Sequence, residues 1–478
     1  MALGDEKFSE TDVLLTRTKP SGRERAASRW VTVEPLLFLA SASYSMANLL
    51  RTQYVLIRVQ ELYNYTMHAE SLCQGQNKSE NSTDHDIAAR IQADSAHWLL
   101  VFTLVGALPG FVSAIVLGSL SDRFGRKVVL IVSTVGNTVF AGVCTAVMAF
   151  RLPLEVFYAA DIAIGLSGGS TVVLALSYSY IADVTTSNKR TFRLVVIETV
   201  YFSVGLTQVG IEYSLERLGF APTAGISAGL GFLSLIYSVF PNVLIETVGR
   251  REGHQPMRDK LSESLRGMWR LLHGEGGAGR TCRLFLIYLI CFTLTPLESS
   301  QQIRILYAEG EPLCWTPVVI GYYLAFGCLL FLIGNIGGFK LLARWFSNHW
   351  IFQIGCFGAI LAYVGTGFVK TSVLFFAVLL LLTFTGLCFP VIRSSLSKLV
   401  RTDEQGIAFS LFACVESLGT YLSSISLNAV YMATVTFYPP FVYMLIAGIT
   451  FIPSVLVWVF HVLSRRAGDT SINREQPT

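Results

Sequence analysis

Ionisable side chains interrupt several long apolar segments of this sequence. The residues concerned are Arg51, Asp161, Glu198, Glu298, Arg304, Arg393 and Glu416. A charge inside the hydrocarbon of a membrane is costly, so each such residue is a functional hypothesis: an ion path, a proton relay or a ligand contact. Carboxylates can carry protons there, and arginines can hold anions.

Glu416 is the clearest candidate for a proton carrier. It lies about three helical turns into its apolar segment, too deep for its carboxyl to reach the surface easily. The alternative is a protonated carboxyl that is hydrogen-bonded to a neighbouring helix. Glu198 and Arg393 lie nearer the ends of their segments, so for them the alternative is a side chain that extends to the membrane surface.

Arg51 and Asp161 form a second hypothesis. Their segments run in opposite directions, and both residues fall about two turns below the outer surface. Equal depth allows the two charges to pair, which offsets the cost of burying either one alone. We expect an intramembrane ion pair.

The most polar stretch of any apolar segment follows Pro296. It contains Glu298, Gln301 and Gln302. A proline frees backbone groups, which is tolerated at membrane depth where the chain lines a cavity. These side chains are therefore predicted to bind substrate, and the alternative is that the helix simply ends early at the outer surface.

The elements that position these residues are membrane-spanning helices. Of the 478 residues, 52% are hydrophobic and 14% charged, and apolar runs of the roughly 20 residues that cross a bilayer recur along the chain. We expect an all-α membrane protein of twelve spans. They are placed at 33–57, 97–119, 128–150, 154–183, 193–216, 221–245, 282–307, 317–342, 350–369, 372–397, 405–431 and 437–463.

Lysine and arginine crowd alternate loops, which places those loops on the cytoplasmic side. Both termini and the basic central segment are thereby cytoplasmic, and the chain divides into two six-helix halves. The expected parts are an N-terminal tail (1–32), an N-terminal half (33–245), a linker (246–281), a C-terminal half (282–463) and a C-terminal tail (464–478).

The large outer loop 58–96 carries three glycosylation sequons, at Asn64, Asn77 and Asn81. Cys73 lies in the same loop, and Cys314 lies in a short loop on the same side. An oxidising compartment would allow these two cysteines to form a disulfide, and the alternative is two free thiols.

A motif between the second and third spans points to a known superfamily. Its residues are Gly118, Asp122, Arg123, Gly125, Arg126 and Lys127. They match the signature G-x-x-x-D-R-x-G-R-[RK] of major facilitators, in which a carboxylate held against guanidinium groups can latch helices in one state of alternating access. Substrates of this fold bind between the halves.

Longer stretches resemble the proton-coupled folate transporter family, solute carrier family 46. The most specific is Cys388–Ser410, and the segments 312–322, 52–54, 33–35 and 182–193 fit as well. The resemblance implies proton-coupled transport of organic anions, among which members carry folates, haem, steroid and bile-acid conjugates or muropeptides. It implies further that Cys73 pairs with Cys314, that Arg393 binds substrate and that Glu198 couples the proton.

This sequence departs from the folate-transporting member of the family at four positions. Gly169 stands where that member has an aspartate, Leu297 where it has a histidine and Asp161 where it has an arginine. Glu416 is similar to the steroid-conjugate member, whereas the folate transporter has an amide. Folate is therefore disfavoured as the substrate, while coupling through Glu198 or Glu416 is retained.

The N-terminal tail contains an acidic dileucine pattern, formed by Glu10, Leu14 and Leu15, that sorting adaptors recognise. We expect location in the plasma membrane or in the endosome or lysosome membrane, contact with lipid, a proton as coupling ion and no other cofactor or metal. Nucleic-acid binding and enzymatic activity are not expected. A lysosomal exporter of catabolites and a non-transporting membrane receptor are the alternative functions.

Overall fold

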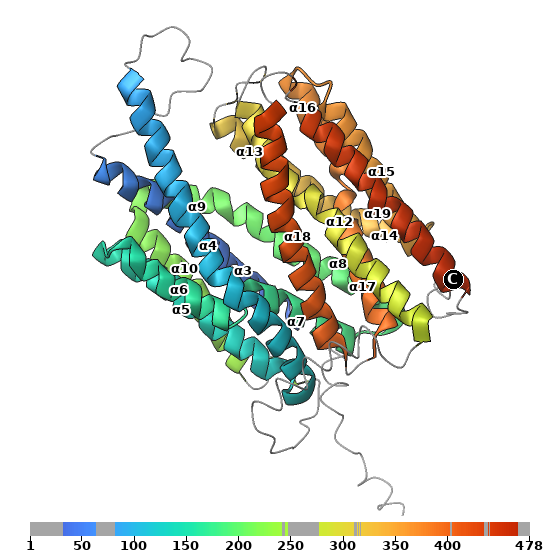
Figure 1. Cartoon of the computed structure of the whole chain (residues 1–478). Coiled ribbons are helices and arrows are strands. Elements are labelled where there is room, and N and C mark those ends of the chain that lie inside the picture. Colours follow the sequence, from blue (N-terminus) through green and yellow to red (C-terminus); the bar gives the residue numbers. More distant parts are fainter. Residues whose placement is uncertain are drawn as a thin grey trace, which may run out of the picture.

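A computed structural model describes residues 32–63, 82–240, 244–246, 277–309, 313, 315, 317–401, 404–434, 438 and 440–466. Every regular element in these residues is helical. The helices form two sets that stand side by side, the first in blue to green and the second in yellow to red (Figure 1).

The first set crosses the bundle six times within the described residues. Its members are α3 (Glu34–Leu62), α4 (Ser82–Phe124), α5 (Arg126–Phe150), the crossing η2–α6–α7 (Leu154–Val156, Phe157–Leu166, Gly169–Val184), the crossing α8–η3–α9 (Ser187–Ser203, Val204–Leu206, Thr207–Leu218) and α10 (Phe220–Val239).

The second set likewise makes six crossings in the part of the chain that the structure describes. Its members are α12 (Gly277–Glu309), the crossing α13–η4–α14 (Pro317–Leu332, Ile333–Gly338, Phe339–Ala343), α15 (Asn348–Thr366), the crossing α16–η5–α17 (Ser372–Leu382, Thr385–Leu387, Cys388–Leu399), α18 (Gln405–Thr434) and α19 (Phe441–Arg466).

Each of the twelve predicted spans overlaps one of these crossings, which confirms the predicted fold class. Ten crossings are long and apolar enough to span a membrane by length and composition. The two that are less apolar are α3 and α8–η3–α9. They carry Arg51 and Glu198 respectively, so the polar residues that attract functional interest also weaken the hydropathy signal.

One helix start and one proline differ from the sequence-based predictions. Helix α4 already begins at Ser82, so helix occupies part of the predicted outer loop 58–96. Helix α12 continues through Pro296 to Glu309, so the alternative of a helix that ends early at this proline is wrong. Residues 297–309 therefore present their side chains with helical spacing.

The break between α6 and α7 has a backbone cause. Gly168 has φ +77° and Gly169 has φ +54°, the left-handed region that favours glycine. A methyl group at Gly168 would in addition collide with the side chain of Val172. The two glycines thus allow the chain to change direction at the middle of this crossing.

Small and hydroxylated residues hold the first set together. Thr145 and Thr138 on α5 donate to the carbonyls of Ala224 and Gly231 on α10, at 2.8 and 2.9 Å. Asn137 donates to the carbonyl of Ala40 on α3 at 3.1 Å. Close backbone approach and interhelical hydrogen bonds are the usual way in which helices associate without a hydrophobic driving force.

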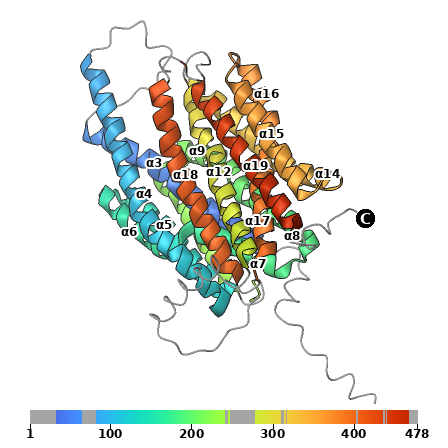
Figure 2. The ribbon, with the colours of Figure 1, turned by 45° about the vertical axis from the view of Figure 1, so that its right-hand side comes forward.

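We call the end of the bundle that holds Asp122, Arg126 and Glu246 the motif end; it lies at the bottom of Figure 1. Helices α7, α8 and α17 run together near this end in the turned view as well (Figure 2). The large buried core cluster contains residues of both sets, so the sets are packed against each other there rather than merely adjacent.

Candidate functional site

Arg393 on α17 binds carboxylates from both sets of helices. Its Nη1 donates to Oε2 of Glu198 on α8. Its Nη2 donates to both oxygens of Glu416 on α18, at 2.5 and 2.6 Å. The Tyr178 hydroxyl on α7 donates to the same oxygen of Glu198. We call Glu198, Arg393 and Glu416 the charge triad.

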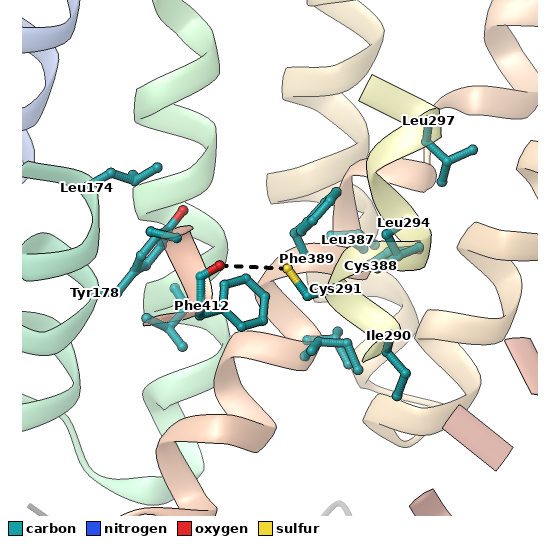
Figure 3. Close-up of a cluster of buried hydrophobic side chains, with 14 of the residues drawn as sticks. Leu174, Tyr178, Ile290, Cys291, Leu294, Leu297, Leu387, Cys388, Phe389 and Phe412 are labelled. Atoms are coloured by element: carbon teal, nitrogen blue, oxygen red, sulfur yellow. Dashed lines mark hydrogen bonds between the residues drawn. The ribbon is translucent and has the colours of Figure 1, made fainter. Parts of the chain in front are cut away.

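Aromatic rings enclose the guanidinium of the triad. Its central carbon lies 4.4 Å from the ring centroid of Tyr178, 5.2 Å from that of Phe412 and 5.3 Å from that of Phe389. Figure 3 shows these three rings with Cys291, whose thiol donates to the Phe412 carbonyl at 3.9 Å. Ring faces attract a cation, and here they also exclude water from it.

Burial settles how the triad residues lie. Arg393 is 1% exposed and Glu198 is 2% exposed, so the alternative in which they extend to the membrane surface is wrong. The Glu416 side chain keeps 13% of its surface accessible. When all three groups are ionised the triad carries one positive and two negative charges, and one added proton makes it neutral.

A cavity of about 480 Å³ lies next to the triad, between the two sets of helices. Glu198 and Phe389 form part of its wall. The first set adds Tyr44 and Asn48 from α3, and the second adds residues of α12, α13 and α16. A cavity of this size suits a small organic ligand.

The polar stretch after Pro296 borders this cavity. Glu298 and Gln301 both line it. The Thr420 hydroxyl on α18 donates to the Glu298 carboxylate at 3.5 Å. The side chain of Gln302, the third predicted substrate contact, lies outside the description, as does that of Arg123 in the motif.

Asp122 of the motif reaches across to the second set. Its two oxygens accept hydrogen bonds from the backbone N–H groups of Gly406, at 2.9 Å, and Ile407, at 3.1 Å. These groups open helix α18, whose positive end attracts the carboxylate. Asp122 also forms an ion pair with Arg126.

Glycines permit the approach of α4 to α18. A methyl group on Gly118 would collide with Oγ of Ser410, and one on Gly406 would lie 2.5 Å from the Gly118 carbonyl oxygen. The two helices therefore touch along their backbones at the motif end. Any side chain at either glycine would separate them.

The rest of the motif is anchored within the first set. Nε of Arg126 donates to Asp183 on α7 at 3.0 Å. Glu246 accepts from the backbone N–H groups of Arg126, at 2.8 Å, and Lys127, at 3.1 Å. Gly125, with φ +107°, leaves the space that this carboxylate fills. A carboxylate is favourable at these free N–H groups of the first turn of α5.

Further bonds cross between the sets at the motif end. The hydroxyls of Thr191 on α8 and Ser394 on α17 lie 2.7 Å apart. Arg190 donates to the Ser397 carbonyl at 3.2 Å. Together with the contacts of Asp122 they join the two sets at the motif end.

Arg51 and Asp161 are brought together behind the cavity wall. Arg51 Nη1 lies 2.7 Å from Asp161 Oδ1, and both side chains are about 5% exposed. Arg51 Nη2 donates to the Asn48 side chain at 2.8 Å. Its guanidinium also faces the rings of Phe102 and Phe140, at 5.4 and 5.3 Å.

Sequence reasoning missed four partners: Tyr178, Asp183, Glu246 and the start of helix α18. Asp183 and the start of α18 lie in segments that carry the family resemblance, but no pattern in the sequence signals these contacts, because each joins distant helices. Other predicted residues lie outside the described part of the chain. They are Glu10, Leu14, Leu15, Asn64, Cys73, Asn77, Asn81 and Cys314.

Two sets of six helical crossings in the described residues, with a cavity between them, are the architecture of the major facilitators. The family model of the Major Facilitator Superfamily matches residues 36–424, and the chain belongs to this superfamily. Among solved structures, the human organic anion transporter MFSD10 has a TM-score of 0.68 at 16% identity, covering 92% of this chain and 100% of its own. The fucose:proton symporter of E. coli has a TM-score of 0.62 at 15% identity, covering 89% and 98%.

Closer relatives place the chain within solute carrier family 46. It is 30% identical to the lysosomal proton-coupled steroid conjugate and bile acid symporter SLC46A3 of Pongo abelii, over 91% of this chain and 95% of that protein. It is 31% identical to the proton-coupled folate transporter of Rattus norvegicus, over 89% and 91%. The predicted family is confirmed, and these relatives are transporters rather than enzymes.

Proposed function

We propose that this protein is a proton-coupled symporter of organic anions that works by alternating access. The observation that carries the proposal is the charge triad, in which Arg393 joins a carboxylate of one half to a carboxylate of the other beside the cavity. A proton taken up there changes how strongly the halves are held together. The functions of the relatives support the same assignment.

Glu416 is the carboxylate that loads the proton. Its side chain is more accessible than that of Glu198, and both it and Arg393 belong to the second set of helices. Protonated Glu416 leaves a neutral pair of Arg393 and Glu198, so the cavity can close without burying a net charge. The ion pair of Glu198 with Arg393 then links the two halves.

The direct test is uptake of a labelled organic anion into proteoliposomes with an imposed proton gradient. We expect the wild type to be faster at acidic outside pH and to lose this advantage with a protonophore. A transport rate that changes neither with outside pH nor with the protonophore would refute proton coupling.

Two matched variants separate the roles of the carboxylates. Glu416→Gln should abolish gradient-driven uptake but keep exchange of labelled for unlabelled anion, because the amide resembles the protonated acid. Glu198→Gln should slow exchange as well, because it removes the tie between the halves. Gradient-driven uptake by Glu416→Gln at the wild-type rate would contradict the assignment of the proton.

The motif end is proposed to face the cytosol, in accord with the basic loops. The cavity would then be closed toward the cytosol in this conformation. Glycans at Asn64, Asn77 and Asn81 and a disulfide between Cys73 and Cys314 would lie on the outer or lumenal side. The dileucine pattern at Glu10, Leu14 and Leu15 would direct the protein to endosomes or lysosomes; replacing both leucines with alanine should move a tagged protein to the plasma membrane.

A further inference from the structure

The cavity contains a cation that the charge triad does not explain. Among the described residues that line it, Arg304 on α12 is the one with a positive charge. Arg393, by contrast, is covered by two carboxylates and three rings and does not appear in the cavity wall. An anion that enters the cavity in this conformation therefore meets Arg304 and not Arg393.

The guanidinium of Arg304 has an N–H group that no acceptor of the described residues occupies. No carboxylate of the described residues forms an ion pair with it. Its Nε is buried and lacks a hydrogen-bond partner there. Tyr323 on α13 lines the same cavity and interacts with the guanidinium. Arg304 is partly exposed and lines the cavity, so its accessible N–H groups can donate to a bound anion, whose charge would offset the cost of a guanidinium without a carboxylate partner.

Helix α12 presents three side chains to the cavity from one face. Leu297, Gln301 and Arg304 are four and three residues apart, on one face of α12, and all three line the cavity. Gln301 can add an amide N–H to the guanidinium N–H groups. Arginine suits a carboxylate, sulfate or sulfonate because its planar fork can bond two oxygens at once.

Acidic side chains in the remaining wall disfavour a second negative charge on the ligand. Glu298 and Glu198 both line the cavity, so a second anionic group would face a carboxylate. The second set adds the rings of Phe331 and Phe389, and the first set adds Tyr44 and Asn48. These walls match a ligand with an apolar body and hydrogen-bonding groups along one side.

We infer that Arg304 binds the anionic group of the substrate and that the cavity selects monovalent amphipathic organic acids over dicarboxylates. This inference rests on the proposed function and assigns the substrate class at the same cavity. Tyr323 acts as a positioning residue for the guanidinium from the same cavity wall.

The experiment measures gradient-driven uptake of taurocholate by the full chain in proteoliposomes. The sulfonate of this probe is ionised throughout the accessible pH range, so pH acts on the protein alone. We expect Arg304→Gln to raise KM at least about tenfold, the loss expected for one hydrogen-bonded charge contact. Arg304→Lys should raise it less, because the positive charge remains. Methotrexate, a dicarboxylate, should compete weakly with the wild type.

Arg217→Gln is the matched control. Arg217 is exposed on α9 and faces the ring of Tyr213 at 5.8 Å, so its loss changes the charge of the protein without touching the cavity. Its KM should equal that of the wild type. Tyr323→Phe should raise KM a few-fold, and a thermal unfolding profile like that of the wild type shows that the variant is folded.

Each result has a separate meaning. A KM for Arg304→Gln within about twofold of the wild type, with the wild type active, overturns this inference and leaves the proposed function standing. Equal uptake of taurocholate and methotrexate overturns the selectivity. A wild type that carries no organic anion under any gradient overturns the proposed function itself, and this inference with it.

Discussion

The contact of Asp122 with helix α18 allows a quantitative prediction about conformational balance. Asp122→Asn keeps the size of the side chain but removes its charge and one of its two acceptor oxygens. The wild-type carboxylate accepts from Gly406 at 2.9 Å and from Ile407 at 3.1 Å. One lost bond to a charged group is worth about 1.5–3 kcal/mol, and the lost attraction to the helix end adds about 0.3–1 kcal/mol.

A net weakening of about 2 kcal/mol shifts the equilibrium between closed and open motif ends roughly 30-fold toward the open form. Spin labels on opposite halves measure this shift as a distance. Lys189, in the first turn of α8, and Arg401, after α17, are both exposed and belong to opposite halves. Cys282 is exposed and is replaced with serine so that it takes up no label. Asp122→Asn should add a population at longer distance.

Glu246→Gln is the matched control for this prediction. It removes a carboxylate from the same motif, but the bonds that Glu246 accepts come from the start of α5 in its own half. It should destabilise the motif without changing the distance between the labels. An Asp122→Asn distribution that equals the wild type, or a Glu246→Gln distribution that shifts as far, would refute the role of Asp122 as a latch.

Two further predictions concern stability in detergent, measured by thermal unfolding. Arg51→Ala should cost about 3–5 kcal/mol because it leaves Asp161 buried without its partner, and Asp161→Ala in the same chain should restore part of this loss. A purely additive double mutant would contradict the pairing. Gly125→Ala should cost about 1–3 kcal/mol, since it strains a positive φ and displaces Glu246. Gly142→Ala, within α5, has open space and should be neutral or stabilising; equal losses at both glycines would contradict the explanation.

The sequence allowed the spans and the depth of single residues to be predicted. Hydropathy placed every crossing, and equal depth suggested that Arg51 and Asp161 meet, as they do at 2.7 Å. Depth follows from counting residues at 1.5 Å per residue along a helix. Direction around the helix axis does not follow, because a buried membrane helix is apolar on all sides.

The contacts between the halves could not be predicted from the sequence, because they depend on the direction of each side chain around its helix axis. Glu198 and Arg393 are far apart in the sequence, and each alone is explained as a side chain near a helix end. The orientation of α8 and α17 about their axes brings both residues together with Glu416 in the charge triad. The sequence identifies Arg304 as an ionisable residue within an apolar segment. That it has no carboxylate partner among the described residues could be seen only from the structure of the cavity walls.

The proton that the triad binds also determines how transport responds to voltage. Glu198, Arg393 and Glu416 carry the same charge before and after a cycle, so the net charge moved is that of the proton and the monovalent anion, which cancel. A cycle with this stoichiometry is electroneutral. Each elementary charge moved through 100 mV would gain or lose about 2.3 kcal/mol, and the net charge moved in this cycle is zero. A pH difference alone would then drive accumulation, even across a membrane that is fully depolarised.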